Sequence, residues 1–259
     1  MKSQPVDPDY VQSLARGLAV IEAFTEARRP LTLSDVARSA AISRAAARRM
    51  LHTLSGLGYV GSVDGKLFTL RPRVLGLGYA YLSTLDLRDV AEDHMRRLAE
   101  QLHESCSLSV LDGDDIVYVA RVPSKRIMTI ALTVGTRLPA YATSMGRVLL
   151  SGLPADALDA YFDRVKLKPL TRTTIVDPER LRAEIRRTQG RGWAIVDQEL
   201  EEGVRSVAVP IRDAGGRVIA AVNLSAHATR VTIEELQRCF LPHLRDAASK
   251  IEAVMPRRI

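Results

Sequence analysis

Cysteine is nearly absent from this chain of 259 residues, which has Cys106 and Cys239 far apart and no others. No cysteines are spaced as in a zinc site or a disulfide framework, so the sequence favours neither kind of scaffold. We expect two reduced, buried thiols in a protein of the cytoplasm.

Long apolar runs are also absent, although 46% of the residues are hydrophobic. The sequence contains no stretch of about 18 apolar residues, the length needed to cross a membrane. Residues 1–5 lack the apolar core of a signal peptide. Aromatic residues make up 5% of the chain, and no helical pattern sets Trp or Phe opposite a basic face. We therefore expect a globular protein that does not bind membranes.

Signatures of catalysis and of metal binding are missing too. His94 and His103 share one predicted helix without H-E-x-x-H spacing or neighbouring cysteines. The segment 112–115 lacks the ligand spacing of a calcium loop and fits a hairpin turn better. Ser144 has no G-x-S-x-G context and no recognisable His and Asp partners. We expect no catalytic residue, no metal and no cofactor.

The segment 31–70 has the pattern of a helix-turn-helix followed by a β-hairpin. Thr32 and Ser43 are good N-caps for two successive helices, the second predicted over residues 44–57. An Asp-Gly pair at 64–65 between two β-prone runs predicts the hairpin, or wing. The predicted apolar stripe of the second helix consists of Ala47, Met50, Leu51, Leu54 and Leu57.

The second helix of this motif also carries the side chains that a DNA groove requires. Small residues at its start allow close approach to the bases, and arginines on its other face can reach phosphates or guanine edges. The predicted DNA-contacting residues are Ser43, Arg44, Ala45, Arg48, Arg49 and, in the wing, Lys66. A solvated basic helix in an unrelated domain is the alternative, but the preceding helix and the wing favour DNA binding.

Positive charge is concentrated in this part of the chain. The whole chain has a net charge of +7, and residues 1–82 supply +5 of it, with eleven Lys or Arg against six Asp or Glu. A cationic excess in one small module indicates a polyanionic partner, here double-stranded DNA. We therefore place the protein at the nucleoid.

The pattern of hydrophobic residues divides the chain into four parts. We predict a disordered tail over 1–9, a winged helix-turn-helix over 10–71, a linker helix over 72–84 and an effector-binding domain over 85–259. From Cys106 onward the hydrophobic period changes to two, which predicts a mixed sheet with helices at both ends of the domain, an α+β fold. The strands are expected over 105–111, 116–122, 127–132, 192–196, 207–211 and 218–224, and a single C-terminal helix over 232–255.

Four stretches resemble those of IclR-family transcriptional regulators: residues 13–18, 43–51, 138–147 and 192–210. Residues 197–201, followed by Arg205 and Ser206, are similar to the branch that controls protocatechuate and 4-hydroxybenzoate catabolism in the β-ketoadipate pathway. The resemblance implies a GAF-like effector domain that binds a small organic acid. A single winged module reads too few base pairs, so we expect a symmetric homodimer on a pseudopalindrome, and the resemblance suggests that two such dimers pair through their effector domains.

The resemblance places the effector on one sheet face, beneath the helix that starts near Ser144. The implied effector-binding residues are Thr143, Ser144, Met145, Gly146, Ser206, Asn223 and Ser225. Asn223 and Ser225 alternate along a strand and so share a face, and a helix N-terminus offers N–H groups to a carboxylate. Several relatives have an acid where this chain has Val196, so that contact is in question.

Several assignments stay open at this stage. Asn223 and Ser225 could instead satisfy backbone groups of the sheet. Arg147 and Arg205 fit either surface positions or carboxylate clamps, and Arg126 fits a solvated loop. Dimer contacts are expected from Leu14, Leu18, Ile21, Leu75, Tyr79 and Leu82.

Two classes of function compete for this chain. A ligand-responsive DNA-binding regulator that is not an enzyme is the interpretation that the motifs favour. The alternative is an enzyme, or a non-regulatory small-molecule binder, that the N-terminal module tethers to DNA. No spacing of acid, base and nucleophile supports an enzyme.

Overall fold

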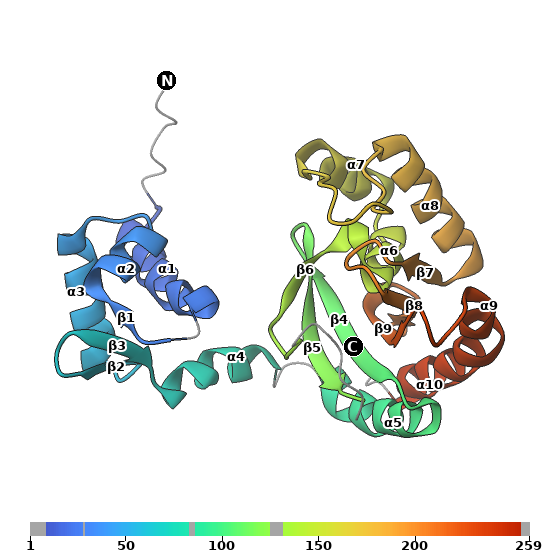
Figure 1. Ribbon diagram of the computed structural model, residues 1–259, viewed down its shortest axis with the longest axis horizontal. Coiled ribbons are helices and arrows are strands. Elements are labelled where there is room, and N and C mark those ends of the chain that lie inside the picture. The colour runs from blue at the N-terminus through green and yellow to red at the C-terminus, as the bar shows by residue number, and fades with distance from the viewer. Residues whose placement is uncertain (1–8, 28, 83–85, 125–131, 255–259) are drawn as a thin grey trace. The chain divides into compact units, whose positions relative to one another are not determined.

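The computed structural model describes residues 9–27, 29–82, 86–124 and 132–254 (Figure 1). The chain falls into two compact units, Met1–Thr84 and Leu85–Ile259. Among the described residues, none of the helices combines the length and the apolar character that a membrane crossing needs.

The N-terminal unit is a small helical domain with a three-stranded sheet. Its helices are α1 (Gln12–Ala27), α2 (Leu33–Ser39) and α3 (Arg44–Gly56), and its strands are β1 (Leu31–Thr32), β2 (Val60–Val63) and β3 (Leu67–Leu70), in the order β1-β3-β2. A short 3-10 turn (Pro72–Val74) and α4 (Leu75–Leu82) follow. Thr32 and Asp35 form a capping box at α2, and Ser43 caps α3, so the local signals for both helix starts are confirmed.

The apolar faces of α1, α2 and α3 close the core of this unit. Val20, Val36, Ala47 and Leu51 are buried there. Leu57 was expected on the stripe of α3 but is 49% exposed, so that prediction is wrong. The helix ends at Gly56, and Leu57 is its C-cap, followed by Gly58 at φ +78°, so Leu57 lies beyond Leu54, the last buried residue of the stripe.

The C-terminal unit is built around a six-stranded antiparallel sheet in the order β6-β5-β4-β9-β8-β7. The strands are β4 (Ser105–Asp112), β5 (Asp115–Val122), β6 (Arg137–Pro139), β7 (Ala194–Asp197), β8 (Val204–Arg212) and β9 (Val218–His227). The helices are α5 (Asp86–Leu102), α6 (Ser144–Ser151), α7 (Ala155–Arg164), α8 (Pro178–Arg191), α9 (Ile233–Glu235) and α10 (Leu241–Val254).

Helices cover both faces of this sheet (Figure 1). Helices α5 and α10 contact each other and pack on β4, β5, β8 and β9. Helix α6 packs on β8 and β9, with α8 against it. The Ser109 side chain of β4 contacts Met145 of α6, so it points to the sheet face that α6 covers. Because side chains alternate between the two faces along a strand, every second residue of β4 counted from Ser109 points to that same face. That face holds the candidate site.

Three sequence predictions for this unit are wrong or lie outside the described residues. The strand expected over 127–132 lies outside the described residues except for Leu132, which is not in a strand, while β6 was not expected. The single C-terminal helix is interrupted by a π turn, Leu236–Phe240. Cys106 is buried as expected, but Cys239 is exposed because it lies on the outer side of that turn, between the buried Leu236 and Phe240.

Candidate functional site

Helix α3 presents its arginines to solvent. The Ser43 hydroxyl accepts a hydrogen bond from the Ala46 N–H at 3.2 Å, which fixes the start of the helix. Ala47 is buried on the inner side, while the predicted DNA-contacting residues of the helix are all exposed: Ser43, Arg44, Ala45, Arg48 and Arg49. Within the described residues, no ion pair engages the three guanidinium groups. They therefore form a surface with unneutralised positive charge.

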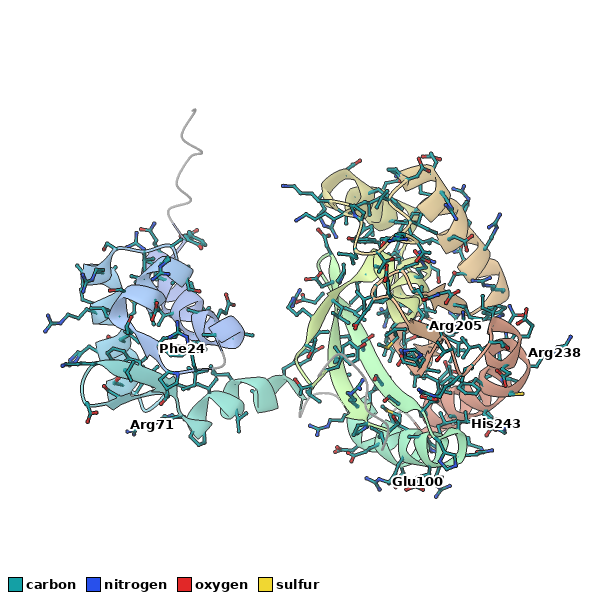
Figure 2. All side chains as sticks on the ribbon, viewed as in Figure 1. Phe24, Arg71, Glu100, Arg205, Arg238 and His243 are labelled. Carbon is teal, nitrogen blue, oxygen red and sulfur yellow. The ribbon has the colours of Figure 1, made fainter. Side chains whose placement is uncertain are left out.

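The wing forms where the Asp-Gly pair predicted it. Asp64 and Gly65 both have positive φ, +54° and +66°, as a tight hairpin turn requires, and Lys66 is exposed beside them. At the base of the wing the Arg73 guanidinium lies 5.3 Å from the centroid of the Tyr59 ring. Arg71 packs there as well (Figure 2), since a Cβ on Gly61 would lie 2.9 Å from its Nε. The sequence analysis did not single out these two arginines.

A small cavity of about 30 Å³ lies between the start of α6 and the sheet of the C-terminal unit. It is lined by Tyr118, Leu132, Ala142, Thr143, Ser144, Met145, Val196, Leu200, Val204, Ser206, Asn223 and Ser225. Six of the seven residues predicted to bind the effector are therefore brought together here. The volume suffices for about one or two water molecules, so a larger ligand requires the cavity to widen.

Gly146 is the predicted residue that does not line this cavity. It is buried in the first turn of α6, and a Cβ on it would lie 2.1 Å from the carbonyl oxygen of Ala140. Its hydrogen atom thus allows the backbone of α6 to pack against the preceding 3-10 turn, Ala140–Ala142.

The N-terminus of α6 contributes hydroxyl and N–H groups. Thr143 caps the helix by accepting the Gly146 N–H at 3.0 Å. Ser144 and Ser206 of β8 share a hydrogen bond of 2.8 Å between their Oγ atoms. The N–H groups of Ser144 and Met145 belong to the first turn and so have no acceptor within the helix. This is the kind of donor set that accommodates a carboxylate.

Asn223 has an unpaired polar atom at the cavity. The residue is 3% exposed, and its Nδ2 donates to Ser225 Oγ at 2.9 Å, whereas its Oδ1 has no hydrogen-bond partner among the described residues. Leaving a buried polar atom unpaired costs about 1–3 kcal/mol. The arrangement disfavours the alternative that Asn223 satisfies the sheet backbone, because its bonded partner is a side chain.

A row of buried serines on β4 extends this polar floor. Ser105, Ser107 and Ser109 pair with Ser225, Asn223 and Ala221 of β9, respectively, so all lie on the face that α6 covers. The sequence analysis missed the row, although its signal was a serine at every second position from 105 to 109.

Tyr118 of β5 also lines the cavity. Burial raises its pKa to about 12, against the opposing effect of the nearby Arg121 charge. The Tyr118 phenol is therefore neutral at physiological pH and can donate a hydrogen bond.

Two of the three arginines whose roles the sequence did not decide have carboxylate partners within the protein. Arg147 is buried and donates to Glu199 Oε2 at 2.5 Å and to the carbonyl of Tyr141 at 3.2 Å. Arg205 donates to both carboxylate oxygens of Asp197, at 2.9 and 3.1 Å. Neither guanidinium is left as a free clamp for an effector. Arg126 lies outside the described residues.

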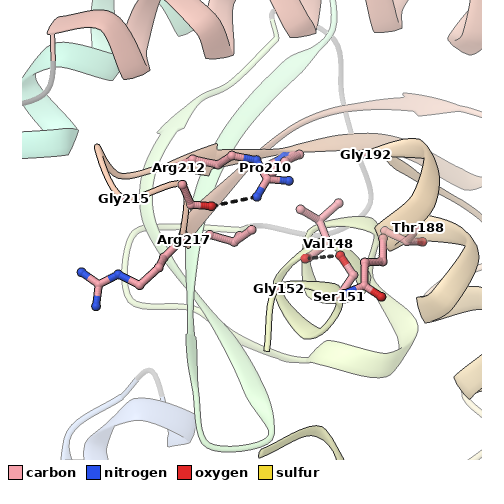
Figure 3. A pocket seen from close by; sticks show the side chains of 12 residues that line it. Val148, Ser151, Gly152, Thr188, Gly192, Pro210, Arg212, Gly215 and Arg217 are labelled. Atoms are coloured by element: carbon pink, nitrogen blue, oxygen red, sulfur yellow. Dashed lines mark hydrogen bonds between the residues drawn. The ribbon is translucent and has the colours of Figure 1, made fainter. Parts of the chain in front are cut away.

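A second, larger cavity of about 290 Å³ lies between α6, α8 and the turn that joins β8 to β9 (Figure 3). Arg212 borders it and donates to the Gly216 carbonyl at 3.0 Å. Ser151 borders it as well and donates to the Val148 carbonyl at 2.7 Å. This cavity contains none of the residues predicted to bind the effector.

No group of three His, Cys, Asp or Glu side chains that could hold a metal ion occurs in the described part of the chain. Within its described residues, the structure has a winged helix-turn-helix with unpaired arginines, followed by a domain whose mainly apolar cavity contains several hydroxyl groups and one amide. These two parts define the class of ligand-responsive DNA-binding regulators.

The chain belongs to the IclR family of bacterial transcriptional regulators. Residues 79–253 match the model of the bacterial transcriptional regulator IclR C-terminal domain, and residues 13–64 match the IclR helix-turn-helix domain. The predicted family and the α+β fold class, with a winged helix-turn-helix before an effector domain, are confirmed. The regulator is thus the supported interpretation, and nothing in these matches indicates catalysis.

Similar proteins confirm the predicted branch as well. The chain is 50% identical to the Pca regulon regulatory protein of Pseudomonas putida, over 93% of this chain and 83% of that protein. It is 37% identical to the p-hydroxybenzoate hydroxylase transcriptional activator of Acinetobacter baylyi, over 94% and 91% of the two chains.

Two solved structures resemble this chain along almost all of its length. A regulator from Rhodococcus sp. RHA1 superposes with a TM-score of 0.83 at 55% identity, over 94% of this chain and 98% of that one. An IclR homologue from Microbacterium hydrocarbonoxydans, in complex with 4-hydroxybenzoate, superposes with a TM-score of 0.82 at 28% identity, over 93% and 98%.

Proposed function

We propose that this regulator controls genes of aromatic-acid catabolism and that a small carboxylate effector binds in the cavity beneath α6. The observation that carries the proposal is the unpaired, buried amide oxygen of Asn223 in a cavity lined by hydroxyl groups. Since a side-chain amide can be turned to present either its oxygen or its nitrogen, Asn223 can meet a hydroxyl or a carboxylate.

Three effectors fit this chemistry: protocatechuate, 4-hydroxybenzoate and β-ketoadipate. The names of the similar regulators refer to the Pca regulon and to p-hydroxybenzoate hydroxylase, and a structural relative is in complex with 4-hydroxybenzoate. Ser144, Ser206 and Ser225 would supply hydrogen bonds, while Met145, Leu132 and Leu200 would pack against the ring or chain.

Effector binding would change the contact between α6 and the sheet. The cavity is smaller than any of the three acids, and the Ser144–Ser206 hydrogen bond joins α6 to β8 across it. An effector group that replaces one of these hydroxyls as a partner separates the start of α6 from β8. We propose this displacement as the first step of the response to the effector.

At the DNA, we propose that α3 enters the major groove and that the wing contacts the flanking backbone. The proposed contacts are the exposed Ser43, Arg44, Ala45, Arg48, Arg49 and Lys66. Such a protein works in the cytoplasm, at the nucleoid.

A single module covers few base pairs, so we propose a symmetric dimer on a pseudopalindromic operator, and a pairing of two such dimers through the effector domains. Exposed apolar side chains on two helices support a dimer contact: Leu14 and Leu18 on α1, and Leu75, Leu77 and Tyr81 on α4. Ile21 packs instead against the core of the N-terminal unit. The side chains of Tyr79 and Leu82 lie outside the described residues.

Titration calorimetry of the full-length protein with the three acids tests the effector assignment. At least one acid should bind with measurable heat and raise the melting temperature, because ligand binding to the folded state stabilises it. Absence of heat and of a thermal shift with all three acids would remove the pathway assignment and leave the DNA-binding assignment standing.

A further inference from the structure

We infer that Arg121 of β5 binds an acidic group of the effector, together with Ser107 and Asn223, at a second anchoring point of the effector site. The inference rests on the proposed function. It assigns a positive charge to a site whose cavity-lining residues include no Lys, Arg or His.

Strand register brings these three residues together. Ser107 of β4 pairs with Asn223 of β9 on one side and with Arg121 of β5 on the other. Side chains of directly paired residues share a face and lie about 5 Å apart at Cβ. Arg121 Nη1 donates to Ser107 Oγ at 3.3 Å, which confirms that the guanidinium turns to this face. Arg121 is thus one strand beyond the serine row, in line with Asn223.

Arg121 has an incomplete set of partners for a partly buried cation. Burial lowers its pKa, which shows that the charged form is penalised where it lies. Within the described residues its guanidinium has a hydrogen bond to Ser107 but no carboxylate. The segment 125–131 contains no Asp or Glu in its sequence. An anion would therefore complete the coordination of Arg121.

The other arginines considered for this role are already neutralised. Arg147 is paired with Glu199 and Arg205 with Asp197. By contrast, Asn223 and Arg121 present an unpaired amide oxygen and an unneutralised cation on either side of one serine. A carboxylate placed over Ser107 can contact both residues if the Asn223 amide turns its nitrogen inward.

Two sources of that carboxylate are possible, and they predict different ligand preferences. In an aromatic monoacid, its single carboxylate would meet Arg121 and its ring hydroxyl would point toward α6. In a diacid, one carboxylate would meet Arg121 and the other the first turn of α6. The chemistry at Arg121 is the same in both cases.

The test compares acids with their neutral amides in wild-type protein and in Arg121→Gln, by calorimetry of the full-length chain. The probes are 4-hydroxybenzoate, protocatechuate, β-ketoadipate and the corresponding amides. Arg121→Gln should weaken binding of the acid about 10- to 100-fold and that of the amide by less than about threefold, because only the acid gains a charge-assisted bond. Arg121→Lys should retain much of the preference for the acid, since it keeps the charge but loses the fork geometry.

Arg238→Gln is the matched control, because Arg238 is an exposed arginine of the same unit on the π turn (Figure 2). It should leave all affinities unchanged. Ser107→Ala serves as a second variant if Arg121→Gln does not fold, and it should weaken acid binding about threefold or more by releasing the guanidinium.

If Arg121→Gln loses affinity for the monoacids, or for the diacid alone, relative to the wild-type protein, the result supports the inference. Which acids are affected identifies the source of the carboxylate. Equal losses for acid and amide would overturn it, as would unchanged affinity for the acid. If the wild-type protein bound none of the acids, the proposed function and this inference would both fall.

Discussion

Arg147 on α6 and Glu199, just after β7, form a buried ion pair with 2.5 Å between Nη2 and Oε2. Glu199 also accepts the Ile175 N–H at 3.0 Å, so one carboxylate joins α6 to the segment at Ile175 and to its own segment after β7. Because α6 provides Ser144 and Met145 to that cavity, this ion pair fixes the helix on which the proposed effector response depends.

Removal of the Glu199 charge should therefore destabilise the effector domain. Glu199→Gln leaves the Arg147 guanidinium buried without a counter-ion, and breaking such a pair costs about 3–5 kcal/mol. Urea unfolding followed by circular dichroism measures the change in the free energy of unfolding. Glu202→Gln, an exposed acid nearby, is the control and should change it by less than about 0.5 kcal/mol. Equal stabilities of the two variants would show that the ion pair does not hold α6.

Gly146 and Gly190 offer a matched pair of glycine substitutions in helices. Gly146→Ala would place a Cβ against the Ala140 carbonyl, a backbone atom that cannot move aside cheaply. Gly146→Ala should lower the free energy of unfolding by about 1–3 kcal/mol. The Cβ of Gly190→Ala in α8 would meet none of the described residues within 4 Å, and the substitution should stabilise the protein by about 0.5–1 kcal/mol. Thermal unfolding of the two variants should show shifts of opposite sign, and shifts of the same sign would contradict the close packing at Gly146.

The arginines of α3 should carry the affinity for DNA. Arg48→Ala or Arg49→Ala should cost about 1–3 kcal/mol if the side chain contacts a base edge. If it contacts only a phosphate, the affinity should fall on every sequence and the salt dependence should decrease by about one unit of slope. Fluorescence anisotropy with an operator selected from random DNA measures both quantities. Arg186→Ala, at an exposed arginine of α8, should bind as the wild-type protein does. A folded double variant with normal operator affinity would rule out α3 as the recognition helix.

The two thiols should differ in reactivity. The thiolate is the reactive form, and burial raises the pKa of the Cys106 thiol, so this residue stays protonated and inaccessible. Cys239 is exposed. An alkylating reagent at pH 8 should modify Cys239 alone in the folded protein and both thiols in denaturant, as counted by mass spectrometry. Modification of Cys106 at the same rate as Cys239 in the folded protein would contradict the burial of β4.

Local signals predicted the helix starts of this protein well. Thr32 and Ser43 cap α2 and α3 as predicted, because a cap needs only the three residues that follow it. Strand β6 was missed since it is three residues long, includes Pro139 and exists through its pairing with β5. Such a strand has no periodicity of its own to detect.

In the candidate site, too, the sequence could predict features within one strand but not contacts between distant segments. Asn223 and Ser225 could be placed on one face because they alternate along a single strand. Arg121 could not be placed beside Asn223 from the sequence, because their proximity depends on the register of β5, β4 and β9. Arg147 and Glu199 are 52 residues apart in sequence, so their pairing had no sequence signal.

Operator binding by Asn223→Asp, with and without effector, tests the central claim most directly. The substitution replaces the amide, whose oxygen has no partner among the described residues, with a carboxylate of nearly the same shape, which should repel an acidic effector. In fluorescence anisotropy, the acid that binds the wild-type protein should change its operator affinity at least about threefold, since allosteric couplings usually amount to about 1–3 kcal/mol. Asn223→Asp should bind the operator as tightly as the wild-type protein does and show no response to that acid. A full response in Asn223→Asp would contradict the effector site beneath α6.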